Sequence, residues 1–302
     1  MAKTLTLEHE EHLSLITLNR PERRNAISME LMEELPAALE ACAEHWSRPA
    51  AGAQAAGEAS PEGGGQGPSG GRANGAVGGG AVAITGAGSA FCAGMDIETL
   101  REMGRLGPAH ALTDAQKMAR LFQRIYEFPL PTIAAVNGPA VAGGCGLASV
   151  CDFTLAAPEA KFGYTEVRIG FLPALVATYL LRQIGEKRAR DLLLTGRLIG
   201  AQEAQAWGLV TEVVASAADL LPRTRQLAAA LARNSPASLR ATKQLLQDLP
   251  LYSRPEALAM AAKANAALRT TEDYREGLAA FLEKRPPRWA PAARGGVPRN
   301  EP

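Results

Sequence analysis

Two glycine-rich segments, each directly after an apolar run, contain the groups that could do chemistry. The first spans residues 89–97 (SAFCAGMDI) and the second spans residues 135–146 (AVNGPAVAGGCG). Glycines let a backbone approach a ligand closely, and free N–H groups at the start of a helix favour negative charge. The N–H of Gly143, paired with a free N–H near Met95, would form an oxyanion hole. Glycines after strands are more often tight turns, so spacing alone leaves both interpretations open.

Glu166 is the candidate acid or base. It lies between Tyr164 and the largely apolar run 169–172. Burial in apolar surroundings raises the pKa of a carboxyl group toward neutrality, which suits proton exchange with a carbon atom. The alternative is a surface glutamate or an ion pair with Arg168, and the local sequence by itself favours that alternative.

Other common catalytic motifs are absent from the sequence. Residues 86–88 (GAG) suggest a dinucleotide loop, but Phe91 stands where that loop needs its third glycine. There is no G-x-S-x-G elbow and no Walker loop, and the four histidines lack metal-ligand spacing, so no metal site is predicted. Cys92 and Cys145 have no histidine nearby, which argues against a catalytic thiol.

Strands and helices must position these candidates, and the apolar periodicity predicts them. Ser28 is the expected N-cap of a helix that runs to about Trp46, with Pro36 kinking it or marking its true start. After about residue 173 the pattern is almost wholly helical, and Gly208 is a predicted C-cap. The other predicted elements are strands at 5–7, 13–18, 81–85, 132–136 and 151–156, and helices at 113–128 and near 143–144.

The order of these elements predicts an α/β core over residues 1–200 and a helical subdomain over residues 201–285. Residues 49–80 interrupt the core: twelve of these 32 positions are glycine and none is aromatic. Such a segment cannot bury enough apolar surface to offset its ordering entropy, so a flexible insertion is expected. Residues 286–302 are rich in proline and arginine and are predicted to form a disordered tail.

Composition narrows the class of protein. The 302 residues have a net charge of +1, from 32 basic and 31 acidic side chains. That balance argues against nucleic acid as a partner. The four cysteines form no C-x-x-C pair, no stretch of ~18 apolar residues is present, and the first residues do not resemble a secretory signal. A cytoplasmic protein with no membrane span is therefore expected.

Several motifs resemble those of the crotonase (enoyl-CoA hydratase/isomerase) superfamily in order and separation. The similarity covers nearly the whole chain except residues 49–80 and the tail, and so many motifs in register are specific to that superfamily. They are LNRP at 18–21 with NA at 25–26, FCAGMDI at 91–97, AVNG at 135–138, GGCGL at 143–147, CDF at 151–153, KFG at 161–163 with Glu166, LTG at 194–196, AWGLV at 206–210 and FLEKR at 281–285.

The resemblance implies a ββα superhelix core and three catalytic positions. The N–H groups of Met95 and Gly143 would hold the thioester oxygen of an acyl-CoA. Glu166 matches the acid/base glutamate that exchanges a proton with the substrate's α or γ carbon. Each donor of an oxyanion hole can contribute roughly 10²–10³ in rate.

The resemblance also implies how coenzyme A is held, as part of the substrate and without a separate cofactor. The adenine end would lie against residues 95–98, and a C-terminal pair would reach a CoA bound largely by another subunit. A homo-oligomer, a trimer or a dimer of trimers, is implied. The residues concerned are Met95, Asp96, Ile97, Glu98, Phe281 and Lys284.

Gly146 departs from the pattern of hydratases in the superfamily. They carry a second glutamate at this position, which orients and activates the added water. A single carboxylate can still move a proton between two carbons, which is isomerase chemistry. The run 163–171 (GYTEVRIGF) is closer to a bacterial branch described as enoyl-CoA hydratase. We therefore expect a 2-enoyl-CoA hydratase, with Δ3-Δ2-enoyl-CoA isomerase as the alternative.

A non-catalytic CoA-binding or RNA-binding protein is a third interpretation. The missing second glutamate and the basic residues Arg182, Lys187, Arg188 and Arg190 motivate it. The near-neutral net charge argues against RNA binding as the main role.

Overall fold

A six-stranded sheet lies at the centre of the protein. The structure is a computed structural model and describes residues 4–47, 79–103, 105 and 107–290. The strand order is β1-β2-β3-β4-β6-β9, antiparallel between β1 and β2 and parallel elsewhere. A second sheet has the order β5-β7-β8. The strands are β1 (Leu5–His9), β2 (Leu13–Leu18), β3 (Ala81–Gly86), β4 (Thr132–Val136), β5 (Ala140–Val141), β6 (Phe153–Ala156), β7 (Lys161–Gly163), β8 (Ile199–Gly200) and β9 (Glu212–Val213).

Both faces of the sheet are covered, because successive side chains of a strand point to opposite faces. In β3, Val82 and Ile84 belong to the larger apolar core, which includes α1 (Met29–Ser47). Ala81 and Ala83 face the smaller cluster, which includes α7 (Leu220–Ala232). This two-sided burial explains why β3 is apolar at nearly every position.

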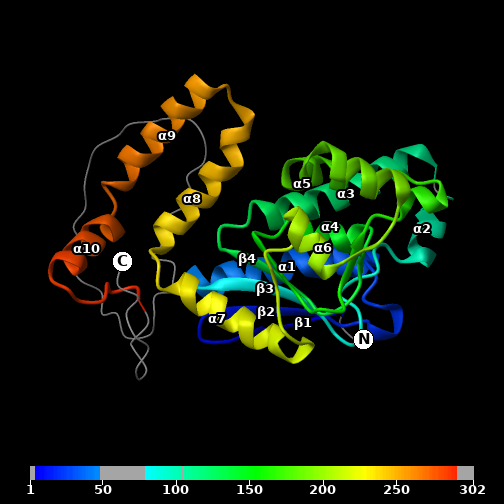
Figure 1. The fold of residues 1–302 in the computed structure, drawn as a ribbon, viewed down its shortest axis with the longest axis horizontal. Helices are drawn as coiled ribbons and strands as arrows, with labels where there is room; N and C mark the ends of the chain where they lie inside the picture. Colours follow the sequence, from blue (N-terminus) through cyan, green and yellow to red (C-terminus); the bar gives the residue numbers. More distant parts are fainter. Residues whose placement is uncertain (1–3, 48–78, 104, 106, 291–302) are drawn as a thin grey trace.

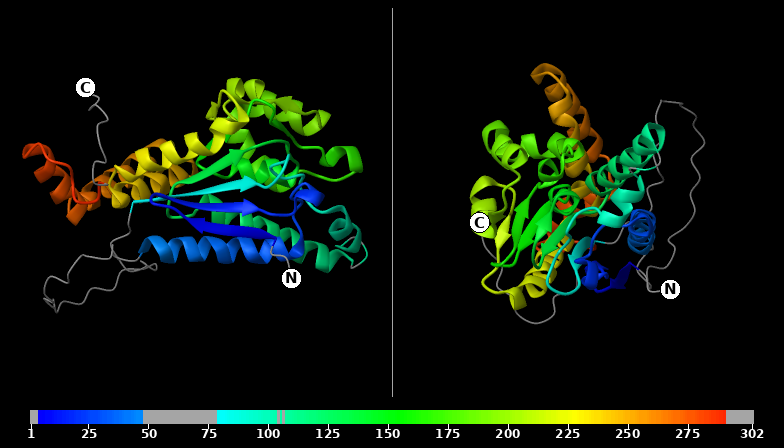
Figure 2. Two further views of the ribbon diagram at one scale, coloured as in Figure 1. Left: turned by 90° about the horizontal axis from the view of Figure 1, so that it is seen from below. Right: turned by 90° about the vertical axis from the view of Figure 1, so that its right-hand side faces the viewer.

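The remaining helices lie on the larger face or extend beyond the sheet. Figures 1 and 2 show that α8, α9 and α10 project away from the strands as an arm. The helices are α2 (Ile97–Met103), α3 (Pro108–Tyr126), α4 (Gly143–Ser149), α5 (Ala174–Thr195), α6 (Ala201–Trp207), α8 (Pro236–Asp248), α9 (Arg254–Leu268) and α10 (Glu272–Leu282). None of the helices in the described ranges is long and apolar enough to cross a membrane.

Most of the expected elements are present, with some differences at their ends. Helix α1 follows Ser28, whose Oγ accepts the N–H of Leu31 at 3.3 Å, and Gly208 caps α6 with φ +88°. Helix α1 continues through Pro36, since Leu35 and Leu39 on either side are buried in the core. Helix α3 begins at Pro108, five residues earlier than its pattern indicates. Helix α2 and strands β5, β7, β8 and β9 were not predicted, and β8 and β9 lie in the part of the chain that was expected to be almost wholly helical.

The chain after residue 200 still contributes to the core. Strand β9 completes the sheet, and α7 packs against its smaller face. The helices that leave the sheet begin with α8, so both sides of the predicted boundary at residue 200 build the core. Of the predicted flexible insertion, residues 49–78 lie outside the described residues, as do residues 291–302 of the predicted tail.

Candidate active site

The two glycine-rich segments meet because they follow neighbouring parallel strands. β3 and β4 pair in parallel, so their carboxyl ends lie at one edge of the sheet. The segments are then joined directly: Phe91 N–H donates to Pro139 O at 3.1 Å, and Val141 N–H donates to Cys92 O at 2.9 Å. Segments that are far apart in the sequence therefore form one rigid wall.

The N–H of Met95 points away from its neighbouring strand segment. Met95 forms a parallel bridge with Ile27, in which Ile27 N–H donates to Gly94 O at 2.7 Å and Asp96 N–H donates to Ile27 O at 2.9 Å. In a parallel bridge the central residue directs its own N–H to the opposite side. Among the described residues, no acceptor bonds the Met95 N–H, so this donor is free for a ligand.

Gly143, the second predicted donor, lies beside Met95. Ala142, which precedes α4, has φ +51° and ψ −125°, a conformation that is unusual for a residue with a side chain and that marks stored strain. A Cβ on Gly143 would lie 4.0 Å from the nitrogen of Met95, so the two residues are neighbours. Gly143 N–H also has no acceptor within the part of the chain that the structure describes.

Gly94 is required for this approach. Its φ is +89°, and a Cβ there would lie 2.9 Å from both Val141 O and the Cβ of Ala142. Any side chain would push the two segments apart. The glycine at this position therefore serves the close contact between Met95 and Gly143, beyond a simple turn.

Glu166 begins a short 3-10 helix, η2 (Glu166–Ile169), and its side chain is half-buried. Its Oε2 is buried and has no hydrogen-bond partner among the described residues. Burial raises the pKa of this carboxyl, and a backbone hydrogen bond opposes the rise only in part. Across the described ranges, Arg168 forms no ion pair with it. The surface and ion-pair interpretations of Glu166 are not what the structure shows.

Glu166 lies close to α4. Burial raises the pKa of the Cys145 thiol to about 12, and the charge of Glu166 contributes to that rise. The same charge acts on the buried hydroxyl of Tyr164. Ala142 N–H, next to Gly143, donates to Gly163 O at 2.8 Å, so the segment that leads to Glu166 runs beside the start of α4.

Gly146 has no room for a side chain. A Cβ there would lie 2.6 Å from Val176 Cγ1 and 2.8 Å from Phe122 Cζ. These apolar groups of α5 and α3 fill the direction in which a second glutamate would leave α4. The absence of that carboxylate is therefore built into the surrounding packing.

The four residues expected near the adenine of CoA have different surroundings. The Asp96 side chain is buried, at 7% exposed, and pairs with Arg20 at 3.0 Å. Ile97 is 80% exposed, and Glu98 forms a solvent-exposed ion pair with Arg23. Of this set, Ile97 and Glu98 offer outward surface, whereas the carboxylate of Asp96 is already engaged within the protein.

Within one chain, Phe281 and Lys284 do not lie near the other predicted site residues. They lie at the end of α10, on the arm that projects away from the sheet (Figure 1). Phe281 is 80% exposed.

The sequence assigned no individual role to Arg20, Asn25, Phe122 or Val176, although Arg20 and Asn25 belong to the LNRP and NA motifs. Asn25 Nδ2 donates to Ala90 O at 2.8 Å and so supports the segment that leads to Met95. The positive φ of Asn25, +55°, favours a residue such as asparagine. The available signal was the N-R-P triplet at 19–21 and the N-A pair at 25–26. Asparagine and proline are typical of turns, so these residues could have indicated a supporting turn. Nothing in the local sequence marks Phe122 or Val176.

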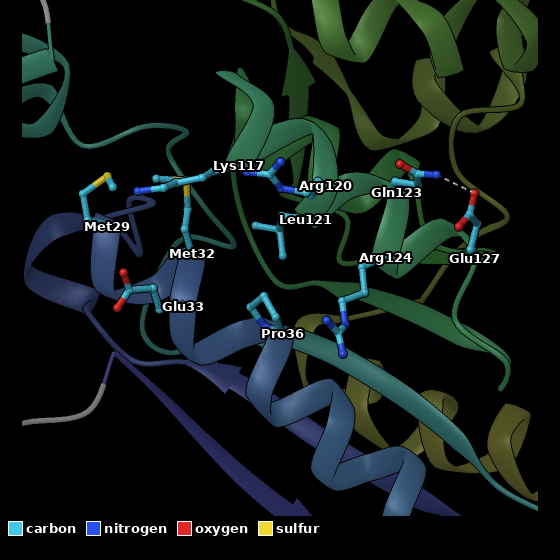
Figure 3. Close-up of a pocket in the computed structure, with 10 residues that line it drawn as sticks. All are labelled: Met29, Met32, Glu33, Pro36, Lys117, Arg120, Leu121, Gln123, Arg124 and Glu127. Carbon is cyan, nitrogen blue, oxygen red and sulfur yellow. Dashed lines mark hydrogen bonds between the residues drawn. The ribbon is translucent and has the colours of Figure 1, made fainter. Parts of the chain in front are cut away.

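A groove of about 450 Å³ lies between α1 and α3 (Figure 3). Met29, Met32 and Leu121 supply apolar surface, while Lys117 and Arg120 supply positive charge. None of the three predicted catalytic residues lines it. Among the described residues, no cluster of His, Cys, Asp and Glu is suited to a metal ion.

Comparison with known proteins places this geometry in a family. The sequence profile described as Enoyl-CoA hydratase/isomerase matches residues 74–292. A Thermus thermophilus protein named as an enoyl-CoA hydratase is 44% identical over 278 residues, covering 92% of this chain and 97% of its own. The 2,3-dehydroadipyl-CoA hydratase of Escherichia coli is 35% identical and covers 94% and 97%.

Solved structures agree. Pseudomonas aeruginosa AtuE superposes with a TM-score of 0.81 at 32% identity, covering 95% of this chain and 100% of its own. An enoyl-CoA hydratase of Bacillus anthracis gives 0.77 at 30% identity, covering 95% and 99%. The predicted crotonase-like α/β fold is thereby confirmed. The chain belongs to the enoyl-CoA hydratase/isomerase family, the crotonase superfamily of enzymes.

Proposed function

We propose that this enzyme is a 2-enoyl-CoA hydratase that uses Glu166 as its single catalytic carboxylate. The observation that carries the proposal is the buried, unpaired Oε2 of Glu166, near the helix that begins at Gly143. An unpaired carboxylate oxygen at a half-buried position costs stability and is retained where it acts on a ligand. The names of the relatives from T. thermophilus and E. coli support hydration as the reaction.

The proposed reaction uses the two free amides as an oxyanion hole. The thioester oxygen accepts hydrogen bonds from the N–H groups of Met95 and Gly143. Glu166 removes a proton from water while the water oxygen bonds to C3. The C2–C3 π electrons then move to form an enolate on the thioester. The amides stabilise that negative charge. Protonated Glu166 then gives its proton to C2, which restores the carboxylate.

Isomerisation of a 3-enoyl-CoA is the second candidate, and the packing at Gly146 favours it. Phe122 and Val176 occupy the space where a second acid would stand, so Glu166 acts without a partner carboxylate. Glu166 would remove a proton from C2, the π electrons would shift through a dienolate held by the same amides, and the proton would return to C4.

Substrate binding would use coenzyme A as the handle, with no separate cofactor. We propose that residues 95–98 hold its adenine end through backbone groups and outward side chains, and that Phe281 and Lys284 contact a CoA bound by a neighbouring copy. Their position on the projecting arm supports a homo-oligomer, a trimer or a dimer of trimers. Exposed apolar side chains along the arm, such as Leu258, Leu278 and Leu282, support the same proposal. Light scattering coupled to size exclusion measures the assembly.

The test is a pair of steady-state assays. Crotonyl-CoA hydration removes the absorbance of the conjugated enoyl thioester, whereas migration of the double bond in 3-hexenoyl-CoA creates it. The hydratase proposal predicts a rapid loss of absorbance with crotonyl-CoA. If the second substrate alone is turned over, the enzyme is the isomerase. If neither reacts, the catalytic proposal fails.

A further inference from the structure

The carboxylate of Asp96 has both oxygens occupied by the protein itself. Oδ2 lies 3.0 Å from Nη2 of Arg20, and Oδ1 accepts the N–H of Glu98 at 3.0 Å. Burial opposes ionisation, but the hydrogen bonds from Glu98 N–H and Arg20 outweigh it and hold the pKa of Asp96 below its ordinary value. The ion pair therefore persists at neutral pH, and both oxygens are hydrogen-bonded within the protein.

Arg20 uses the other arm of its guanidinium on a different segment. Its Nη1 donates to Ala26 O at 3.2 Å, while its own backbone N–H donates to Asn25 Oδ1 at 2.9 Å. The guanidinium of Arg20 thus joins Ala26, which precedes Ile27, to Asp96, which follows Met95. Such a fork fixes two acceptors relative to each other, which a lysine cannot do.

These contacts close a ring around the Met95 peptide. Asp96 N–H donates to Ile27 O, and Ile27 N–H donates to Gly94 O. Arg20 completes the ring on the side chain of Asp96 and on the carbonyl of Ala26. The orientation of the Met95 N–H is consequently fixed on both sides by bonds that never touch the ligand.

We propose that Arg20 and Asp96 are positioning residues for the Met95 N–H and that the Asp96 carboxylate is not a CoA ligand. The proposal rests on the proposed function, in which this N–H binds the thioester oxygen. An oxyanion-hole donor acts mainly on the transition state and is sensitive to small displacements. Disturbing the ring should therefore lower kcat more than it raises KM.

Two variants test the pair in the full-length enzyme. Asp96→Asn keeps an oxygen for the Glu98 N–H but removes the charge that Arg20 needs, and Arg20→Lys keeps charge without the fork. Each is expected to lower kcat about 10- to 10²-fold, less than the roughly 10²–10³-fold cost of losing a whole donor, with KM changed less than about twofold. The double variant should be no worse than the more severe single one, because both act through one bond.

Glu212→Gln is the matched control. Glu212 pairs with Arg223 through two bonds of 2.7 and 2.8 Å on the β9–α7 side of the sheet. The Glu212→Gln substitution removes a paired carboxylate that lies away from Met95, so kcat should be unchanged. Should Asp96→Asn not fold, Arg20→Lys supplies the same comparison.

The thioester carbonyl itself gives the readout that a purely structural role would not move. Bound butyryl-CoA labelled with ¹³C at this carbonyl should show a lowered C=O stretching frequency by infrared difference spectroscopy. That lowering should shrink in Asp96→Asn and persist in Glu212→Gln. A raised KM with kcat preserved, or a carbonyl frequency equal to that of the unaltered enzyme, would overturn the proposal. Butyryl-CoA is saturated, so this readout stands even if Glu166 proves not to be the catalytic acid.

Discussion

Phe122 and Gly146 lie so close that a Cβ on residue 146 would stand 2.8 Å from the ring of Phe122. A side chain at residue 146 could leave α4 only if Phe122 or Val176 moved, so the native packing leaves no room there for a second carboxylate.

Gly146→Ala should lower the free energy of unfolding by about 1–3 kcal/mol, since overpacking forces Phe122 or Val176 to move. In an uncrowded helix the same change would stabilise by up to about 1 kcal/mol, so the sign is informative. Urea denaturation measures it. Adding Phe122→Leu should recover part of the loss, and a stabilised Gly146→Ala would contradict the packing argument.

Gly143→Ala should leave the fold intact and reduce turnover. Its Cβ would lie 3.4 Å from Ile27 Cδ1, 3.9 Å from Gly94 Cα and 4.0 Å from Met95 N, so the methyl fits but stands beside the amide proposed to bind the thioester oxygen. We expect kcat/KM to fall about 10²–10³-fold. Gly200→Ala, whose Cβ would meet nothing within 4 Å, is the control. Equal activity in both variants would exclude an oxyanion hole at Gly143.

Glu166→Gln should lower kcat about 10²–10⁴-fold, the usual range for general acid–base help. In the unaltered enzyme, kcat/KM should rise with pH as Glu166 loses its proton. Because burial raises the pKa of this carboxyl, the midpoint should lie above 4.5. A pH–rate profile of crotonyl-CoA hydration gives the midpoint, and a limb at or below 4.5 would argue against Glu166 as the base.

The same substitution should stabilise the protein at neutral pH. The folded-state pKa of Glu166 is raised, so its charged form is disfavoured by folding. The penalty is absent below the unfolded-state pKa, grows as pH rises toward the folded-state pKa, and is complete above it. Thermal melts of Glu166→Gln and the unaltered enzyme should therefore coincide at acidic pH and diverge toward pH 7, with the variant higher. A constant difference across this range would contradict the burial of the charge.

Lys243→Met should loosen the arm from the core. Lys243 on α8 is 11% exposed and bonds Asp152 at 2.6 Å and Leu130 O at 3.1 Å. Its loss leaves a half-buried carboxylate without its cation and should cost about 1–3 kcal/mol of unfolding free energy. Arg225→Gln breaks a more exposed pair with Glu10 and should cost less than about 1 kcal/mol. Comparable losses in the two variants would show that Lys243 is no special anchor.

The sequence by itself determined the local features of this protein. Apolar runs predicted the strands at 81–85 and 132–136, since a strand covered on both faces is apolar throughout. Ser28 and Gly208 marked helix ends through their capping chemistry. The motifs from residues 18–21 to 281–285, in order and separation, indicated the family. Each of these signals lies within a few neighbouring residues.

The tertiary structure alone decided how distant residues meet. The bridge between Ile27 and Met95 orients the Met95 amide, the ion pair of Arg20 with Asp96 joins the segments around that bridge, and Phe122 and Val176 fill the space beside Gly146. The continuation of α1 through Pro36 is of the same kind, because burial of its flanking leucines overrides the local preference of proline. These outcomes depend on contacts between segments that are far apart in the sequence. Packing energy arises from such contacts, so it cannot be inferred from one short segment, whereas local propensity can.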